Sequence, residues 1–581
     1  MNVLIKWIAT SSSCFVPVCL AFNTLAQSTP PPGVTIPPTV PDAVDRTIPR
    51  PPEAPLIPVE PPIRQPNLQL PAPQEPPKAP TQTGDSSGSL RSNRFLIKKI
   101  VVQGNTVLQA EIAALIQPYQ NREITFEDLL ELRSMIVQLY VKNGYVSSGA
   151  FIPNNQNLSS GIVQIQVVEG ELEQIEIGGL RRLREGYVRT RLERATTTPL
   201  NQRRLEEALQ LLQLDPLIEQ VNAELVAGST PGRNILRVSL KEAPPFHVGI
   251  AIDNFQSPSL GSLQGRLEVT HDNVLGLGDR LNAQYARTEG LNLYDINYSI
   301  PINASNGTLN FRYNSANSRI IENDFRDLGI RSDTQTYSLS LRQPISRTPT
   351  NEFAVSLGLD LRRSQTYILN DIPFSFTEGA ENGESKVTVV RFIQDWVDRG
   401  NRRVFAARSQ FSLGIGAFDA TVNNSGTDGR FFAWLGQFQW VQQLSPRNVL
   451  VARFDAQLTP DSLLSLEQFS LGGVDTIRGY RQNQLVADNG VLGSVEVRLP
   501  LTSDPKVLQL APFFEIGRVW NNRETDPGPA TIASLGLGLR WLITPALSLR
   551  LDYGIPIISV SNRGTSLQEN GFYFSVRYQP F

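Results

Sequence analysis

The sequence predicts two small α+β domains followed by an all-β, 16-stranded antiparallel transmembrane barrel. Three observations lead to this prediction: a proline-rich stretch follows an export signal, one β-α-α-β-β pattern occurs twice, and the rest of the chain alternates apolar and polar residues. The 581 residues are too many for one ordinary core. The net charge of −2 argues against a nucleic-acid partner.

Residues 1–26 are predicted to be a cleaved signal peptide. They combine an apolar centre with small residues before a cleavage position after Ala26. A membrane anchor is the alternative, but three consecutive serines and Pro17 make a poor spanning helix. Both cysteines, Cys14 and Cys19, lie in this segment. The mature chain therefore offers no thiol for a disulfide, a nucleophile or a metal site.

Residues 27–94 are predicted to be a disordered linker. Nearly every third residue is proline up to about Pro80, and a Gly/Ser segment follows. Proline fixes φ and removes a hydrogen-bond donor, so this composition favours extended polyproline II and cannot build a packed core. A spacer is the favoured interpretation; a recognition segment for an aromatic-lined groove is the alternative.

The first α+β unit is expected at residues 95–170. A strand "FLIKKIVVQGN" precedes two helical stretches, and "GAFIP" and "IVQIQVVEG" follow as strands. Thr125 is the predicted N-cap of the second helix with Asp128 at N3, and Gly144 lies past its end.

The second unit, expected at residues 171–244, repeats this order with different residues. Its long helix follows Asn201 as N-cap, and "EQVNAELVAG" and "NILRVSLKEAPP" are its last two strands. Each unit leaves a sheet edge and a helix-lined groove, which suit the capture of an extended peptide by strand addition. The alternative is that both units are spacers.

The barrel is expected at residues 245–581, where the helical period does not return. In "TLNFRYNS", Leu309, Phe311 and Tyr313 share one face, and Asn310 and Arg312 lie on the other. A soluble sandwich would not hide so many polar residues on its inner face, whereas a membrane barrel with a wet lumen does. We count about sixteen such segments, an even number as in bacterial barrels.

One long loop between the eleventh and twelfth expected strands contains "LGGVDTIRGY". Its apolar residues suggest that it folds back into the lumen, where Arg478 would need a carboxylate. In the next strand, "APFFEIGRVW", alternation turns Glu515 and Gly517 inward. Gly479 would allow a sharp turn and Gly517 would clear room beside Glu515. An exposed, unpartnered loop arginine is the alternative.

These features resemble the transporters of two-partner secretion, the haemolysin and filamentous-haemagglutinin secretion/activation proteins. The resemblance rests on the two tandem units, the sixteen strands, "NVLGLGDRL" near the first periplasmic turn, and the loop motif Ile477-Arg478-Gly479-Tyr480. It implies two periplasmic POTRA domains and an outer-membrane barrel. The POTRA domains would capture a large, β-rich exoprotein, unfolded in transit, which leaves through the barrel.

The resemblance also implies that the motif arginine meets an acidic residue in a Phe-x-Asp-x-Gly strand. Residues 513–517 match this pattern with Glu515 in place of aspartate, which keeps the charge and shifts its reach by one methylene. The family often carries an N-terminal plug helix, and none is evident here. A C-terminal aromatic residue is expected as the signal for the barrel-assembly machinery, so Phe581 is the candidate, although Pro580 puts it out of phase with the last strand.

Catalytic chemistry is nearly absent from the sequence. His247 and His271 are the only histidines, so we expect no enzyme, no cofactor and no metal site. Three functions are compatible with a barrel of this kind. An export transporter explains every feature, an insertase for other barrels would share them but has only two POTRA domains to support it, and a diffusion porin leaves the α+β units unexplained.

Overall fold

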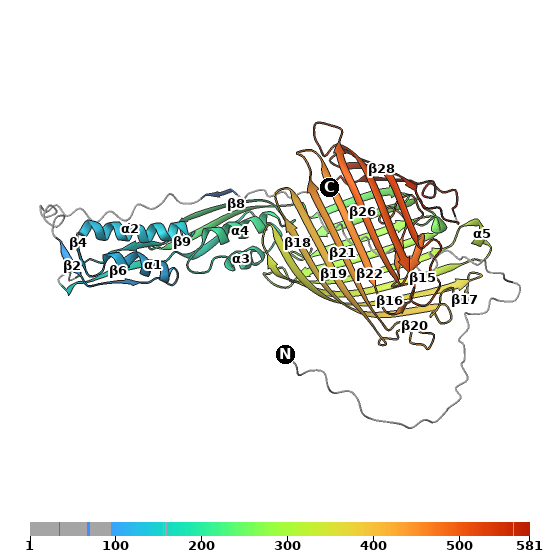
Figure 1. Ribbon diagram of the computed structural model, residues 1–581, viewed down its shortest axis with the longest axis horizontal. Coiled ribbons are helices and arrows are strands. Elements are labelled where there is room, and N and C mark those ends of the chain that lie inside the picture. The colour runs from blue at the N-terminus through green and yellow to red at the C-terminus, as the bar shows by residue number, and fades with distance from the viewer. Residues whose placement is uncertain are drawn as a thin grey trace, which may run out of the picture.

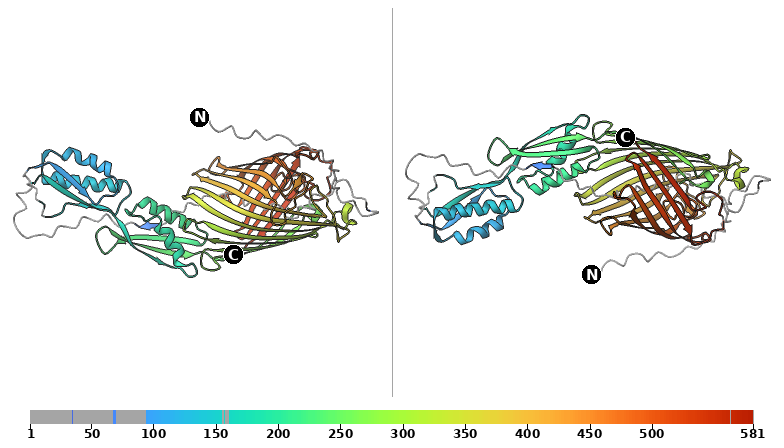
Figure 2. Two further views of the ribbon diagram at one scale, coloured as in Figure 1. Left: turned by 90° about the horizontal axis from the view of Figure 1, so that it is seen from below. Right: turned by 90° about the horizontal axis from the view of Figure 1, so that it is seen from above.

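The computed structural model describes Val34, residues 67–69 and residues 94–580 except 155, 157–159 and 562. Two α+β units form an arm that projects from one end of a β-barrel (Figure 1). Views from below and above in Figure 2 show the same elongated arrangement. The predicted fold class is therefore confirmed. The predicted signal peptide and Phe581 lie outside the described residues.

The first unit packs helices against a small sheet. Its elements are β2 (Phe95–Ile97), β3 (Lys99–Gln103), α1 (Gln109–Ile116), β4 (Arg122–Ile124), α2 (Phe126–Lys142), β5 (Gly149–Phe151) and β6 (Ile162–Val168). β6 pairs parallel with β3 and antiparallel with β5. The α2 helix begins with the predicted capping box, in which the Thr125 hydroxyl accepts from the Asp128 N–H and the Asp128 carboxylate accepts from the Thr125 N–H.

The second unit has the same strand arrangement. Its elements are β7 (Glu171–Gly178), α3 (Glu185–Glu193), α4 (Gln202–Gln213), β8 (Ile218–Ala227) and β9 (Arg233–Glu242). The first strand again pairs parallel with the last, and the last two strands pair antiparallel. The Asn201 side chain accepts from the N–H groups of Arg203 and Arg204 and caps α4 as expected.

A glutamate at the end of the last strand ties each unit together. Glu169 accepts hydrogen bonds from the N–H groups of Thr106 and Val107, which follow the first strand. Glu242 accepts from the corresponding N–H groups of residues 181–183. Burial alone would raise the pKa of each carboxyl, but the hydrogen bonds outweigh it and hold both pKa values below their ordinary range.

Among the described residues of the region expected to be a linker, residues 67–69 form a strand that the sequence did not predict. Strand β1 (Asn67–Gln69) pairs parallel with β8, with Leu68 opposite Ala223, and extends the sheet to the order β1-β8-β9-β7. Backbone hydrogen bonding at an open sheet edge can order a short extended segment whatever its composition, so the composition did not signal it. Val34 packs against loops at the far end of the barrel.

In the described residues, sixteen long antiparallel strands form a closed barrel. They are β10 (Phe246–Asp253), β11 (Gln264–Asp272), β12 (Arg280–Arg287), β13 (Leu291–Pro301), β14 (Thr308–Arg319), β15 (Arg331–Arg347), β16 (Asn351–Ile368), β18 (Glu384–Arg399), β19 (Arg403–Ile415), β21 (Phe431–Gln443), β22 (Val449–Leu458), β26 (Asn489–Pro500), β27 (Leu508–Trp520), β28 (Thr531–Thr544), β29 (Leu547–Pro556) and β30 (Phe572–Tyr578). The barrel closes where β10 pairs with β30, with Ile250 opposite Tyr578.

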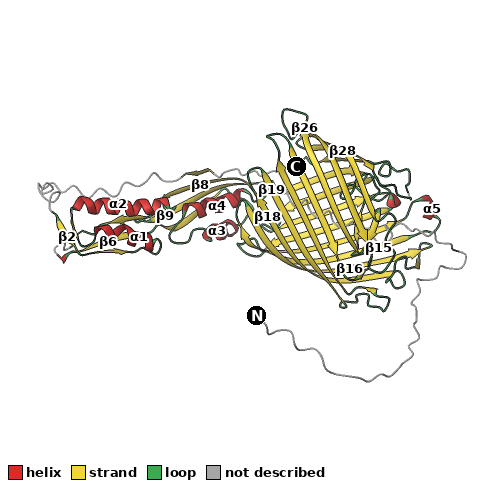
Figure 3. Cartoon of the chain, viewed as in Figure 1, coloured by secondary structure: helices red, strands yellow, loops and turns green. Residues whose placement is uncertain are grey.

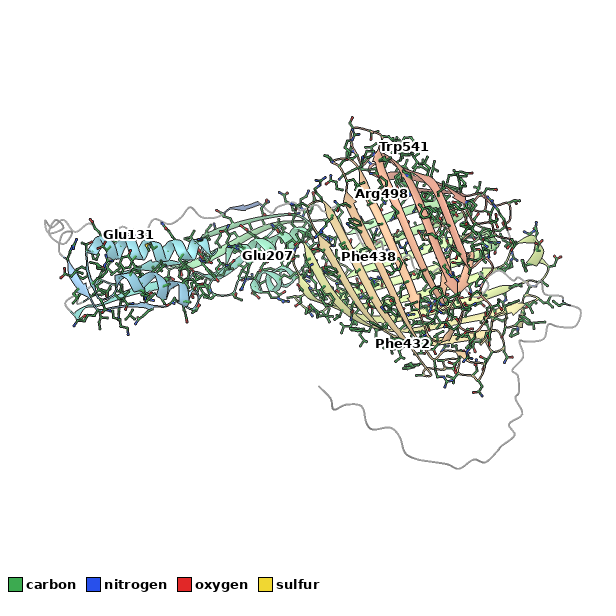
Figure 4. The ribbon with its side chains drawn as sticks, viewed as in Figure 1. Glu131, Glu207, Phe432, Phe438, Arg498 and Trp541 are labelled. Carbon is green, nitrogen blue, oxygen red and sulfur yellow. The ribbon has the colours of Figure 1, made fainter. Side chains whose placement is uncertain are left out.

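The wall is apolar outside and polar inside. Along β14, Leu309 and Phe311 are exposed while Asn314 is buried towards the lumen. Phe432 is exposed on the outer face of β21 and lies farther from the arm than Phe438 (Figure 4). This pattern suits a barrel surrounded by lipid. Figure 3 shows the longer helices confined to the arm, and no helix among the described residues is long and apolar enough to cross a membrane.

The second unit is docked on the near rim of the barrel. Arg191 of α3 donates to Asn306 Oδ1 at 3.0 and 2.7 Å, and its guanidinium stacks 3.4 Å from the centre of the Tyr187 ring. The Arg184 N–H donates to the Gly276 carbonyl in the turn between β11 and β12. The turns after β11 and β13, the second and fourth barrel strands, therefore face the arm. The loop between β22 and β26, the eleventh and twelfth barrel strands, leaves from the opposite end.

Candidate functional site: a loop held inside the barrel

The connection from β22 to β26, residues 459–488, folds back into the lumen as a compact structure. It contains the short strands β23 (Ser462–Leu463), β24 (Phe469–Leu471) and β25 (Leu485–Ala487), the last two of which form an antiparallel hairpin. Leu471, Ile477 and Tyr480 are buried against apolar side chains of the wall. The hairpin tip, residues 472–484, carries the motif.

Arg478 at the tip is surrounded by carboxylates. Its Nε and Nη2 donate to Glu515 Oε1 at 2.9 and 2.6 Å, and its backbone N–H donates to Glu515 Oε2 at 2.7 Å. Nη1 donates to Glu496 Oε2 at 2.9 Å and to Asp552 Oδ1 at 2.8 Å. The guanidinium also lies 3.4 Å from the centre of the Phe513 ring. The structure thus brings together Arg478 and Glu515.

The three carboxylates are not equally dependent on Arg478. Glu496 and Asp552 both accept from Arg540 Nη2 as well, at 3.2 and 2.8 Å. In the described part of the chain, Glu515 has no other guanidinium within hydrogen-bond distance, and only the Ser494 hydroxyl adds a contact at 3.3 Å. Glu515 is 3% exposed. The pairing of the Glu515 charge therefore depends on the loop.

Gly479 allows the tip to lie directly against β29. Its φ is +100°, a conformation that favours glycine, and a Cβ there would lie 3.0 Å from the Gly554 carbonyl oxygen. A Cβ on Gly554 would lie 2.6 Å from the Arg478 carbonyl carbon. Two glycines thus make the close approach possible. The Gly479 N–H donates to the Tyr573 hydroxyl at 2.9 Å.

Tyr480 and Arg481 extend the contacts of the tip. The Tyr480 hydroxyl lies 2.8 Å from the carbonyl oxygens of both Ala533 and Ile558. Arg481 donates to Glu322 Oε2 at 3.1 Å in the loop after β14 and lies 3.4 Å from Glu569 after β29. The tip is consequently fixed to the wall and also to two loops at the end away from the arm.

Gly517 serves the loop in a different way from the one predicted. A Cβ at this position would lie 2.7 Å from Leu471 Cδ1 and 3.0 Å from Ile477 Cδ1. The missing side chain makes room for the apolar residues of the loop instead of for the Glu515 carboxylate.

Sequence reasoning missed Glu496, Asp552 and Tyr573, and it gave Phe513 only as the first residue of the strand motif, without its contact to the Arg478 guanidinium. Both acidic residues lie between apolar residues on strands, so their inward phase was readable in the same way as that of Glu515. No sequence signal showed that Glu496 and Asp552 lie at the same height in the barrel, because local sequence does not determine the register of strands joined by long connections.

The comparisons with known proteins agree with this architecture. The family model described as haemolysin secretion/activation protein ShlB/FhaC/HecB matches residues 232–541, and the model described as POTRA domain, ShlB-type, matches residues 95–170. The outer membrane transporter CdiB of Dickeya dadantii is 24% identical over 499 residues, covering 81% of this chain and 84% of that protein. The hemolysin transporter protein HpmB of Proteus mirabilis is 24% identical, covering 68% and 70%.

Solved structures share the fold. CdiB from Escherichia coli has a TM-score of 0.66 at 24% identity, covering 86% of this chain and 93% of that one. BamA from Haemophilus ducreyi, lacking POTRA domains 1–3, has a TM-score of 0.51 at 15% identity, covering 84% and 100%.

Proposed function

Because the chain belongs to the haemolysin secretion/activation protein family ShlB/FhaC/HecB, we propose that its lumenal loop closes and opens a channel for protein export. Members of this family are transporters, and this protein is an outer-membrane transporter of two-partner secretion with its POTRA region in the periplasm. We place the POTRA domains at residues 95–170 and 171–244 and the barrel at 245–581. We assign no enzymatic step and no cofactor.

The Arg478 cluster is the observation that carries the proposal. The loop tip is bonded to strands β26, β27 and β29 and lies within the lumen, on the route that an exported chain would take through the barrel. A buried guanidinium among three carboxylates defines one closed position, since moving the loop away would leave the buried Arg478 and Glu515 charges unpaired. Export therefore alternates between this closed position and a displaced one.

Capture by strand addition is supported by β1. The edge of β8 accepts an extended segment of the protein's own chain, residues 67–69, through backbone pairing. An unfolded exoprotein can use the same backbone groups, because the affinity of strand addition comes mainly from main-chain hydrogen bonds. We propose this edge as the capture site, with β1 displaced when the exoprotein arrives. Folding of the exoprotein outside the cell would draw it forward.

The other partners follow from the same assignment. Lipids of the outer membrane surround the exposed apolar wall, and the barrel-assembly machinery would insert the protein, with Phe581 as the assembly signal. Insertion of other barrels is the second candidate function; the shared BamA fold does not by itself favour it, since one fold can serve both activities.

A comparison of cells with and without the gene tests the proposed function. Culture medium and outer-membrane proteins are both compared by mass spectrometry. Loss of one or a few large exoproteins from the medium, with other barrels unchanged, is the expected result. A general fall in outer-membrane barrels would show instead that the protein is an insertase, and an unchanged medium would refute export.

A further inference from the structure

A second buried ionic contact fixes the loop at a different place on the wall. Glu467 precedes β24 and is 4% exposed. Its Oε1 accepts from Arg362 Nη1 at 2.7 Å and from Arg391 Nη2 at 2.9 Å. Arg362 belongs to β16 and Arg391 to β18, so one loop carboxylate binds two neighbouring strands.

The wall supplies too little negative charge for its two arginines. Arg391 donates from Nε to Asp360 at 2.5 Å and from Nη1 to the Ser412 hydroxyl at 2.7 Å. Arg362 contacts the Leu466 carbonyl and Glu467, both in the loop. Within the described residues, Asp360 is thus the one wall carboxylate bonded to this arginine pair. Glu467 balances the second charge.

Buried apolar side chains pack next to this contact. Leu463, Leu464 and Leu466 of the loop pack with Val387 and Val389 of β18 in one buried cluster. Electrostatic attraction is stronger in such surroundings than in a water-filled lumen, and the loss of one partner is correspondingly more costly.

The contacts at the tip and at Glu467 have opposite polarity and lie in different sectors of the wall. At the tip, the loop provides a cation to carboxylates on β26, β27 and β29. At Glu467, the loop provides an anion to arginines on β16 and β18. Three strands, β19, β21 and β22, lie between these sectors. The loop therefore spans part of the lumen as a strap held at both ends.

We propose that Glu467 is a second lock of the channel, a positioning residue that holds the entering arm of the loop against β16 and β18. This inference rests on the proposed role of the loop in closing the channel. Release of the Glu467 lock loosens the loop segment around Glu467 from β16 and β18, while Arg478 still holds the tip and Leu463 keeps its hydrogen bond to Asp488. The lumen then widens on the side of β16 and β18.

The test measures ion conductance of the purified full-length protein in planar lipid bilayers. Glu467→Gln removes the charge and keeps the shape. Loss of a hydrogen bond to a charged group should raise the open fraction at least about tenfold. Glu467→Asp, which keeps the charge, should restore much of the closure. Asp295→Asn is the matched control, because Asp295 is a buried lumenal carboxylate bonded to Arg312 on β14 and not to the loop.

Wild-type conductance in folded Glu467→Gln would overturn the proposal, as would equal increases in Glu467→Gln and Asp295→Asn. If Glu467→Gln does not assemble, Arg362→Gln tests the same contact from the wall side. If neither variant assembles while Asp295→Asn does, Glu467 is a structural residue and the proposal fails. The conductance measurement needs no exoprotein, so it tests the second lock separately from the proposed function. A closed lumen in Glu467→Gln refutes the second lock even if export is established. Unchanged export after deletion of the gene refutes the proposed function whatever the conductance.

Discussion

Replacing Arg478 by alanine should destabilise the barrel because it leaves one buried carboxylate, that of Glu515, without a guanidinium partner. The substitution removes both guanidinium bonds to Glu515 and single bonds to Glu496 and Asp552, but the last two carboxylates keep Arg540. Glu515 keeps only the backbone N–H of residue 478 and the Ser494 hydroxyl. Removing one partner of a buried ion pair costs about 3–5 kcal/mol, so Arg478→Ala should lower the free energy of unfolding by that amount.

A second substitution separates stability from function. Arg478→Ala combined with Glu515→Gln removes the unpaired charge, and should recover more than half of the lost stability, since a neutral amide is far less costly to bury. It does not restore the anchor of the loop, so export should remain lost. Exchanging the two charges should recover little, because a carboxylate at position 478 would face Glu496 and Asp552.

The assay combines two measurements on each variant. Thermal unfolding is followed by electrophoresis after incubation at increasing temperatures, because the folded and unfolded barrels differ in mobility. Export is followed by the amount of exoprotein in the medium. Arg312→Ala serves as control, because its pair with Asp295 lies in the lumen away from the loop. Normal export by Arg478→Ala, or export restored by the neutral double variant, would refute the anchoring role.

Three further predictions use other parts of the structure. Gly554→Ala should push Arg478 away from its carboxylates, because the new Cβ would lie 2.6 Å from the Arg478 carbonyl carbon. The loop should then become sensitive to added protease, and an unchanged digestion pattern would contradict this. Deleting residues 67–69 should raise the affinity of the periplasmic arm for exoprotein several-fold in a binding titration, because it frees the β8 edge, and a lower affinity would exclude competition there. Glu242→Gln should flatten the pH dependence of the stability of the second unit. The pKa of Glu242 is lowered in the folded state, so its carboxylate stabilises that state fully above about pH 4.5, the pKa in the unfolded chain. This contribution is lost as the pH falls through the folded pKa. Unfolding curves at pH 7 and in steps below pH 5 check this, and identical slopes for wild type and variant would disprove it.

Much of the fold was predictable because its rules are local. The alternation of Leu309, Phe311 and Tyr313 with polar residues follows from a wall between lipid and water, and needs no knowledge of distant strands. The Thr125 capping box is equally local. The pair of Arg478 and Glu515 could be anticipated from the inward phase of one strand, together with the resemblance to a known loop motif.

The rest depends on contacts between distant segments. Glu496, Asp552 and Glu467 meet their partners only after the barrel has closed and fixed the register of each strand, and no short-range pattern records that register. The β1 strand was missed for a related reason. Its order comes from the open edge of β8, whereas its own sequence indicates only an extended chain.

The glutamate at position 515, where the resemblance leads one to expect aspartate, has a clear use in this geometry. One carboxylate oxygen binds Nε and Nη2 of Arg478, and the other binds the backbone N–H of the same residue. The carboxylate therefore holds the side chain and the main chain of the tip together. A lysine at position 478 could offer a charge but not two fixed donors to one oxygen, so the arrangement requires arginine. The position of the tip is set by this bidentate contact and by the close approach of Gly479 to Gly554, and the apolar packing of Ile477 and Tyr480 holds the hairpin in that place.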